Sequence, residues 1–201
     1  MNATAFVIPA VGTAIDGGYF VGVINLAGEH YGLVVAPKDG GEHEPAPWSK
    51  SAKALAGTRS YCDGHANTAA MAKAGSALAT WARGLDLGGY TDWYLPARDE
   101  LELCYRQLKP WRDENYQYRS GDNPSSVPAG YPYTDTDPPQ TPVANFQDSG
   151  PDAFADDWYW SSTQVAGAEQ FAWCQDFGYG LQSRRRKTDE LRARAVRRCK
   201  L

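Results

Sequence analysis

The basic side chains near the carboxyl end are the residues of this chain most suited to binding chemistry. Residues 184–200 hold nine lysines and arginines but only two acids, so this segment carries +7 while the whole 201-residue chain carries −4. Such a concentration of positive charge in an acidic protein predicts an anionic partner. The planar guanidinium groups of Arg184, Arg185 and Arg186 suit carboxylate or phosphate groups, which they bind in pairs of hydrogen bonds. The alternative is that the basic residues only protect the open edge of a sheet.

Other reactive residue types lack the spacing of an active site. The histidines at positions 30, 43 and 65 are far apart, and no nucleophile elbow, phosphate loop or dinucleotide fingerprint is present. The cysteines at positions 62, 104, 174 and 199 lack zinc-ligand spacing, and we expect free thiols, with a Cys174–Cys199 pair as the alternative. Asp99, Glu100 and Glu102 are expected on the surface of a helix. The sequence therefore predicts no enzyme.

Aspartates between positions 122 and 157 are the candidate oxygen ligands for a cation. Carboxylates of this kind bind calcium when a loop places them at fixed spacing. No such spacing is present, so we expect a solvated acidic loop and no cofactor, with calcium as the alternative. The aspartates are Asp122, Asp135, Asp137, Asp148, Asp152, Asp156 and Asp157.

Composition favours a single loop-rich domain. The chain is 42% hydrophobic and 22% charged, which is ordinary for a globular protein of this length. Its 7 Trp, 12 Tyr, 13 Pro and 20 Gly predict many loops held together by aromatic anchors, with Trp93 and Trp160 in the core. No apolar run is long enough to span a membrane, and residues 1–6 lack the basic and apolar regions of a signal peptide.

The first two thirds of the chain are expected to form a hairpin, two helices and a long loop. Residues 6–12 are a strand or entry segment, residues 19–37 a hairpin and residues 39–47 a loop. One helix runs from residue 63 to about residue 84, capped by Asp63 or Asn67, and a second from residue 97 to about residue 108. Residues 112–150 are polar and rich in Pro and Gly, which predicts a long loop with a functional or mobile role.

The last third is expected to form strands around residues 157–162, 170–177, 181–186 and 191–199, with a glycine turn at 178–180. In the second strand the period of two places Phe171, Trp173, Gln175 and Phe177 on one face. Three large aromatics on that face predict that it is buried. Cys174 is then expected on the outer face, together with Asp176.

Several long, aromatic-rich segments resemble one known family. They are GGYTDWYLPARDEL at 88–101, YWSSTQ at 159–164, AWCQDF at 172–177, Lys187 and RARAVRR at 192–198. These segments are similar to the domain found at the carboxyl end of the Legionella collagen-like adhesin and in many phage and prophage tail-fibre proteins. IPAVG at 8–12, YGLVVAPK at 31–38 and DGHANT at 63–68 resemble the phage branch. The resemblance covers nearly the whole chain.

The resemblance implies an α+β, C-type-lectin-like fold of the formylglycine-generating-enzyme type, with two helices beside small mixed or antiparallel sheets and long loops. Within one domain, residues 1–44 would be the N-terminal hairpin region and residues 45–201 the lectin-like body. It also implies binding rather than catalysis, often as a homotrimer, and some relatives are targets of diversity-generating retroelements. The Glu-Pro-Asn and Gln-Pro-Asp triplets of calcium-dependent sugar binding are absent from the sequence.

The resemblance, together with the basic segment, implies a non-catalytic receptor-binding module at the tip of a phage or prophage tail. Its partners would be a host-cell surface glycan or protein and other tail proteins, and it would be made in the host cytoplasm and located in the virion tail. The alternatives are a structural tail protein, an enzyme of the formylglycine-generating type and a nucleic-acid-binding arginine run. The predicted recognition face is Cys174, Asp176, Tyr179, Leu181, Ser183, Arg184, Arg185 and Arg186.

Overall fold

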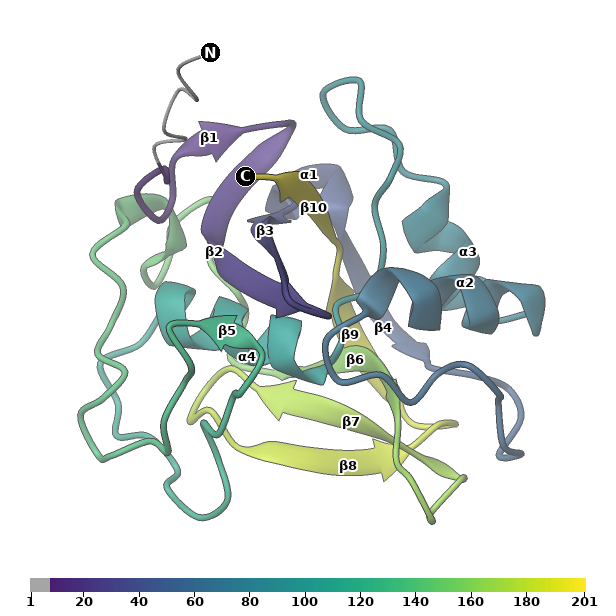
Figure 1. Cartoon of the computed structure of the whole chain (residues 1–201). Helices are drawn as coiled ribbons and strands as arrows, with labels where there is room; N and C mark the ends of the chain where they lie inside the picture. Colours follow the sequence, from purple (N-terminus) through teal and green to yellow (C-terminus); the bar gives the residue numbers. More distant parts are fainter. Residues whose placement is uncertain (1–7) are drawn as a thin grey trace.

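Two five-stranded sheets and a central helix organise residues 8–201, the part of the chain that the computed structural model describes (Figure 1). The first sheet is antiparallel, in the order β1-β2-β3-β10, with β5 also pairing with β2. Its strands are β1 (Ala14–Ile15), β2 (Gly18–Leu26), β3 (Glu29–Val35), β5 (Ser126–Val127) and β10 (Val196–Lys200). The pairing of β3 with β10 joins the beginning of the chain to its end. Residues 6 and 7 of the expected entry segment lie outside the described residues.

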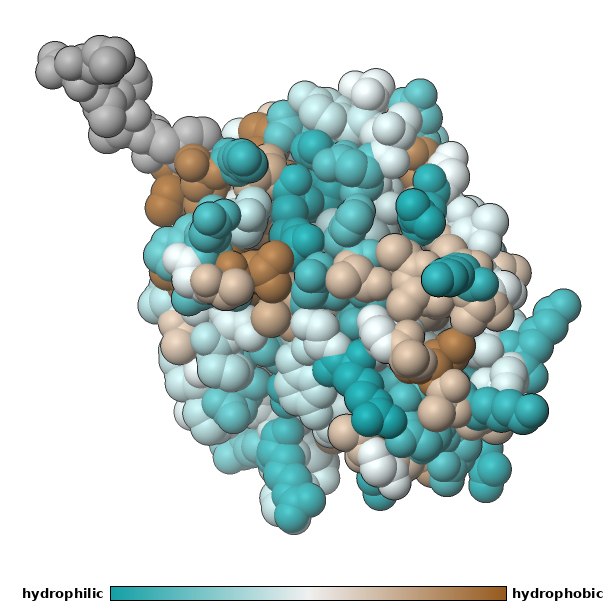
Figure 2. All heavy atoms as spheres, turned by 45° about the vertical axis from the view of Figure 1, so that its right-hand side comes forward, coloured by the Kyte–Doolittle hydropathy of each residue, from teal (hydrophilic) through white to brown (hydrophobic). Residues whose placement is uncertain are grey.

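The second sheet is mixed, in the order β4-β9-β6-β7-β8, because β6 and β9 run parallel. Its strands are β4 (Glu42–Pro47), β6 (Trp158–Gln164), β7 (Phe171–Asp176), β8 (Gln182–Arg186) and β9 (Glu190–Arg194). The described chain is therefore α+β, as predicted. On the face shown in Figure 2, apolar side chains form small patches within a largely polar surface.

The hairpin expected over residues 19–37 is confirmed. Leu26 pairs with Glu29, so a two-residue turn joins β2 to β3. Ala27 and Gly28 both have positive φ, 53° and 91°, which matches the right-handed twist of the strands that they connect. The glycine turn at 178–180 is also confirmed, and Gly180 allows a close approach, since a Cβ there would lie 2.4 Å from the ring of Tyr105.

Three expectations about element boundaries are wrong. Residues 39–47 are not only a loop, because after the short turn α1 (Lys38–Gly41) they form β4, which pairs with β9. The helix expected over 63–84 is two helices, α2 (Gly64–Lys73) and α3 (Ala77–Arg83), because Gly75 takes φ of 86° and Ser76 caps the second helix. The strand expected over 191–199 is broken at Ala195, where the chain passes from one sheet to the other.

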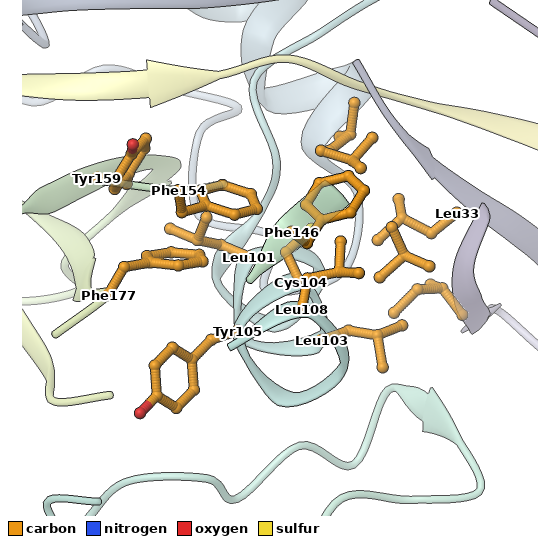
Figure 3. Close-up of a cluster of buried hydrophobic side chains, with 14 of the residues drawn as sticks. Leu33, Leu101, Leu103, Cys104, Tyr105, Leu108, Phe146, Phe154, Tyr159 and Phe177 are labelled. Atoms are coloured by element: carbon orange, nitrogen blue, oxygen red, sulfur yellow. The ribbon is translucent and has the colours of Figure 1, made fainter. Parts of the chain in front are cut away.

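The helix expected from residue 97 is confirmed as α4 (Arg98–Leu108), which lies between the two sheets (Figure 1). Its side chains Leu101, Leu103, Cys104 and Leu108 enter the main core (Figure 3). On one side of α4 the core is a group of aromatic rings, in which Phe154 and Phe177 stack with ring centroids 4.0 Å apart. Trp93 and Trp160, 1% and 0% exposed, are buried in two further clusters, as predicted.

The carboxylates of α4 are buried, which corrects the expectation that they are surface charges. Glu100 is 0% exposed and accepts hydrogen bonds from the Tyr94 hydroxyl at 2.8 Å and from the backbone N–H groups of Ala97 at 2.7 Å and Gly64 at 3.1 Å. Removal from water disfavours the charged form, so burial raises the pKa of Glu100 to about 7, and the nearby Arg198 and these donors offset the effect only in part. Its last donor lies in the first turn of α2, so Glu100 connects the two helices.

Glu102 holds the long loop against α4. Its carboxylate accepts hydrogen bonds from the Tyr133 hydroxyl at 2.8 Å and the Asn123 amide at 2.6 Å, and it pairs with Arg106 at 2.9 Å. Asp99, also fully buried, accepts from the Ser125 hydroxyl at 2.5 Å. Within residues 112–150 the only regular elements are β5 and the short 3-10 helix η1 (Ala144–Phe146). The polar contacts with Glu102 and Asp99 nevertheless attach this long loop to α4.

We predict that Phe177→Ala lowers the free energy of unfolding by about 3–5 kcal/mol, because it removes a buried ring from the aromatic core. Urea denaturation followed by circular dichroism measures the change. Tyr179→Ala is the matched control, because Tyr179 is 56% exposed at the neighbouring turn, and we expect a change within about 0.5 kcal/mol. Equal effects of the two substitutions would contradict the placement of this core.

Candidate functional site

Four of the nine basic residues of the carboxyl-terminal segment are neutralised by carboxylates within the chain. The arginines of residues 192–198 are wholly or largely buried and form ion pairs with carboxylates of distant segments. Arg192 pairs with Asp157 at 3.1 Å, Arg194 with Glu42 at 2.7 Å, Arg197 with Asp92 at 2.7 Å and Arg198 with Asp63 at 3.1 Å. These four arginines hold β9 and β10 to the rest of the fold, so their charge is not free for an external anion.

Lys187 is also an internal residue. It is 0% exposed, its ammonium donates to the backbone oxygen of Lys53 at 3.0 Å and to Gln164 Oε1 at 2.5 Å, and it lies 4.6 Å from the ring centroid of Trp48. Burial disfavours the ammonium ion and lowers the pKa of Lys187 to about 8. Through its hydrogen bond to Lys53, this lysine connects the end of β8 to the segment that follows β4.

Arg184, Arg185 and Arg186 differ from the other arginines of the segment. They lie in β8, the edge strand of the second sheet, and none of them forms an ion pair within residues 8–201. Aromatic rings lie near them instead: Arg184 and Arg186 lie 5.7 and 5.9 Å from the ring centroid of Phe171, and Arg185 lies 4.3 Å from that of Trp158. The outcome is unneutralised positive charge on an edge strand, exposed at Arg184 and Arg186.

The predicted faces of β7 are reversed at its centre. Ala172 and Cys174, 0% and 3% exposed, pack in the core beside Trp160, whereas Phe171 and Trp173 are only half-buried on the opposite face. The period of two is correct, but the prediction that the aromatic side is buried is wrong for Phe171 and Trp173, although it holds for Gln175 and Phe177. That side is covered by cationic and aromatic side chains of other segments, which a pattern within one strand does not reveal.

Cys174 and Asp176 are therefore removed from the predicted recognition face. Burial raises the pKa of the Cys174 thiol to about 12. Within residues 8–201 all four cysteines are free, as expected. Asp176 is 9% exposed and accepts hydrogen bonds from the backbone N–H groups of Gly178 and Tyr179, both at 3.2 Å, so it stabilises the turn between β7 and β8.

The other predicted residues lie at or near the surface. Tyr179 is 56% exposed at the tip of the turn, and Arg184 and Arg186 are exposed. Leu181, Ser183 and Arg185 are half-buried. Ser183 and Arg185 pair with Cys174 and Ala172, so they point away from the face that carries Arg184.

The structure adds residues that sequence reasoning missed. The guanidinium of Arg98 lies 5.1 Å from the ring centroids of both Tyr61 and Trp173. Arg98 Nε and Trp173 Nε1 are buried and lack a hydrogen-bond partner within the described residues. These side chains lie beside the exposed arginines on one side of β7 and β8, and we name the set the arginine–aromatic face: Tyr61, Arg98, Phe171, Trp173, Arg184 and Arg186. No sequence signal linked Tyr61 or Arg98 to β8, because they are more than eighty residues away.

No group of three or more His, Cys, Asp or Glu side chains within residues 8–201 is arranged to hold a metal ion. Several of the aspartates considered for calcium have other contacts: Asp137 accepts from Tyr131, Asp152 from the backbone of Lys38, and Asp157 pairs with Arg192. In the same part of the chain, no helix combines the length and the apolar character that crossing a membrane requires.

Comparison with known families gives one match. Residues 46–197 match the family model described as the Lcl C-terminal domain. The match begins in β4 and ends in β10, so it includes the whole arginine–aromatic face. A search of curated proteins found no match.

We predict that Lys187 makes the free energy of unfolding increase with pH in the alkaline range, and that Lys187→Met removes this increase. The pKa of Lys187 is about 8 in the folded chain and about 10.4 in the unfolded chain. Between these values the unfolded state binds more protons, so the free energy of unfolding gains from Lys187 as the pH rises. Urea titrations of both proteins from pH 7 to pH 10.5 measure the difference, in which the ionisation of shared tyrosines and cysteines cancels. A difference that does not change with pH would show that Lys187 is exposed to solvent.

Proposed function

The chain belongs to the Lcl C-terminal domain family, and from this premise we propose that it is a non-catalytic module that recognises a ligand on a cell surface. The family favours an adhesin-like, surface-binding role. The observation that carries the proposal is the separation of the arginines into two groups. Those of β9 and β10 are paired with internal carboxylates, whereas the three of β8 have no ion-pair partner within residues 8–201.

The proposed ligand is an anionic surface glycan, with a surface protein as the alternative. Guanidinium groups bind carboxylate, sulfate or phosphate groups through paired hydrogen bonds. The half-buried rings of Phe171 and Trp173 add apolar area on which the CH face of a sugar can pack. An exposed site of this kind is weak and sensitive to salt, so we propose that several copies in a homotrimer supply the avidity.

The finer part of the proposal is the biological setting. We propose a receptor-binding module at the tip of a phage or prophage tail, with a C-type-lectin-like fold, a host-cell surface partner and other tail proteins as neighbours. The mixed sheet, the long loop on α4 and the pairing of β3 with β10 support that fold. A role as a target of a diversity-generating retroelement is compatible with this proposal, because Arg184 and Arg186 of the arginine–aromatic face are exposed.

A structural tail protein is the second candidate. The observation that favours it is the position of β8 at the edge of its sheet, where a strand of a neighbouring protein could pair. The two candidates differ in where β8 lies in the assembled particle. Labelling of intact particles with an arginine-reactive reagent, followed by mass spectrometry, distinguishes them, because a β8 buried between tail proteins would be protected.

We predict that the triple substitution Arg184→Ser, Arg185→Ser and Arg186→Ser weakens binding to a sulfated or carboxylated oligosaccharide at least about ten-fold. A glycan array and surface plasmon resonance at two salt concentrations measure the change. Circular dichroism checks the fold, which we expect to be retained because these side chains have no ion-pair partners.

The matched control is Lys73→Ser, Arg83→Ser and Lys200→Ser, which removes the same charge from exposed positions elsewhere. It should weaken binding by less than about three-fold, the effect of long-range electrostatics alone. Equal losses in both triple variants would show that only net charge matters, and undiminished binding in the β8 variant would refute the assigned face.

A further inference from the structure

Exposed tyrosines gather at the start of β8, outside the arginine–aromatic face. They lie on two neighbouring turns, one in the long loop and one between β7 and β8. We name this set the tyrosine patch: Tyr116, Tyr118, Arg119 and Tyr179. The three tyrosines are 44%, 64% and 56% exposed, so their rings are accessible to a ligand.

Hydrogen bonds fix the two turns to each other and to β8. The backbone N–H of Tyr116 donates to the backbone oxygen of Tyr179 at 2.7 Å. The Ser120 hydroxyl oxygen accepts from the backbone N–H of Gln182, the first residue of β8, at 3.3 Å. Arg184 follows two residues later in the same strand, about 7 Å further along and on the same face as the Gln182 side chain. The tyrosine patch is therefore held beside the arginine–aromatic face.

The backbone at Arg119 indicates that this turn presents its side chains to a ligand. Arg119 has φ of 57°, a left-handed conformation that glycine adopts at lower cost. Its guanidinium lies 4.9 Å from the ring centroid of Tyr118 and forms no ion pair within residues 8–201. An arginine in a position that favours glycine, without an internal carboxylate partner, suits an external contact.

The side chains of the patch favour a sugar over a protein partner. The centre of a protein interface is apolar, and no exposed aliphatic side chain lies within residues 116–121 or 178–184. The hydroxyls of Tyr94 and Tyr133 donate to buried carboxylates, whereas those of the three patch tyrosines have no acceptor within residues 8–201. Exposed rings with free hydroxyls accommodate the CH face of a sugar and form hydrogen bonds with its hydroxyl groups.

The charges around the patch favour an uncharged sugar unit. Residues 112–122 hold two arginines and three acids, and the exposed Asp135 adds a fourth acid, because it accepts a hydrogen bond from Gln117 of the same turn. This excess of negative charge repels an acidic group at the tyrosines. The arginine–aromatic face, in which Arg184 and Arg186 have no ion-pair partner among the described residues, suits the acidic unit better.

We propose that the tyrosine patch binds an uncharged sugar unit of the same glycan whose acidic unit the arginine–aromatic face holds, an inference that rests on the proposed recognition of an anionic surface glycan. The rings of Tyr118 and Tyr179 take the CH faces of the sugar, and Arg119 donates to its hydroxyl groups. The ligand is then a chain that contains both acidic and uncharged units. The arginines supply attraction to charge, and the tyrosines supply specificity.

A glycan array probed with the full chain tests the composition of the ligand. Hyaluronan and chondroitin oligosaccharides contain acidic and uncharged units, oligogalacturonate and oligosialic acid are acidic throughout, and maltodextrins and chitin oligosaccharides are uncharged. We expect the tightest binding from the first group, although its members carry fewer charges than those of the second. Tightest binding by the uniformly acidic group would overturn the inference.

The double substitution Tyr118→Ser and Tyr179→Ser tests the patch itself. It should weaken binding of the best mixed oligosaccharide at least about ten-fold, because two ring contacts are lost. The loss should be the same at low and at high salt, since contacts with uncharged rings are not screened by ions. A loss confined to low salt would show that the tyrosines act only through the neighbouring charges, which would overturn the assignment.

The matched control is Ile8→Ser with Val127→Ser, which removes two apolar side chains, 57% and 37% exposed, elsewhere on the surface. It should change the affinity by less than about two-fold. Equal losses in this control and in the tyrosine variant would refute the patch. The Arg184, Arg185 and Arg186 triple serine variant should instead reduce the salt dependence of binding.

Arg119→Gly separates a role in binding from a role in folding. Glycine relieves the positive φ, so the melting temperature should stay the same or rise, while the affinity for the mixed oligosaccharide should fall about three-fold or more. An unchanged affinity would overturn the assignment of this turn to the ligand.

The outcomes distinguish this inference from the proposed function. If uniformly acidic oligosaccharides bind best and the tyrosine variant changes nothing, the inference fails and the proposed function stands. If no acidic oligosaccharide binds, the proposed function fails as well. Tighter binding of an oligothymidylate than of every oligosaccharide would show that the tyrosines stack on bases, which would overturn both assignments to a glycan.

Discussion

The structure depends on the burial of three carboxylates in the first turns of α4. An ionised carboxylate buried without partners is expensive, so the fold must bring hydrogen-bond donors to it. Glu100 receives them from Gly64 at the start of α2, and Glu102 receives them from Tyr133 and Asn123 of the long loop. Because these donors lie 21 to 36 residues away, satisfying the carboxylates fixes α2 and the loop in place on α4.

The need of a buried charge for a partner also separates the arginines into structural and surface residues. An arginine that meets a carboxylate inside the fold becomes part of the scaffold, as Arg194 does with Glu42. One that meets only an aromatic ring, as Arg184 does with Phe171, keeps its positive charge unneutralised by any carboxylate among the described residues. Arg106 combines both situations, because Glu102 balances its charge while one of its nitrogens lacks a partner.

Local sequence patterns predicted the elements whose causes are local. The β2–β3 hairpin follows from two apolar runs around Ala27 and Gly28, and α4 follows from its apolar stripe. The same patterns failed where distant partners decide. The Glu- and Pro-rich sequence of β4 does not predict a strand, because this segment becomes one only by pairing with β9. The prediction that the carboxylates of α4 lie in solvent is wrong because their hydrogen-bond donors come from distant segments.

From the order of the residues alone we could identify the family, the α+β content, most element positions and the concentration of arginines near the carboxyl end. Propensity, turn chemistry and side-chain periodicity are properties of neighbouring residues, so they can be read along the chain. Tertiary structure alone decided which side of β7 is buried, which arginines remain unpaired and which tyrosines lie beside β8. Those outcomes depend on charges, rings and donors that folding brings together from segments as far apart as Glu42 and Arg194.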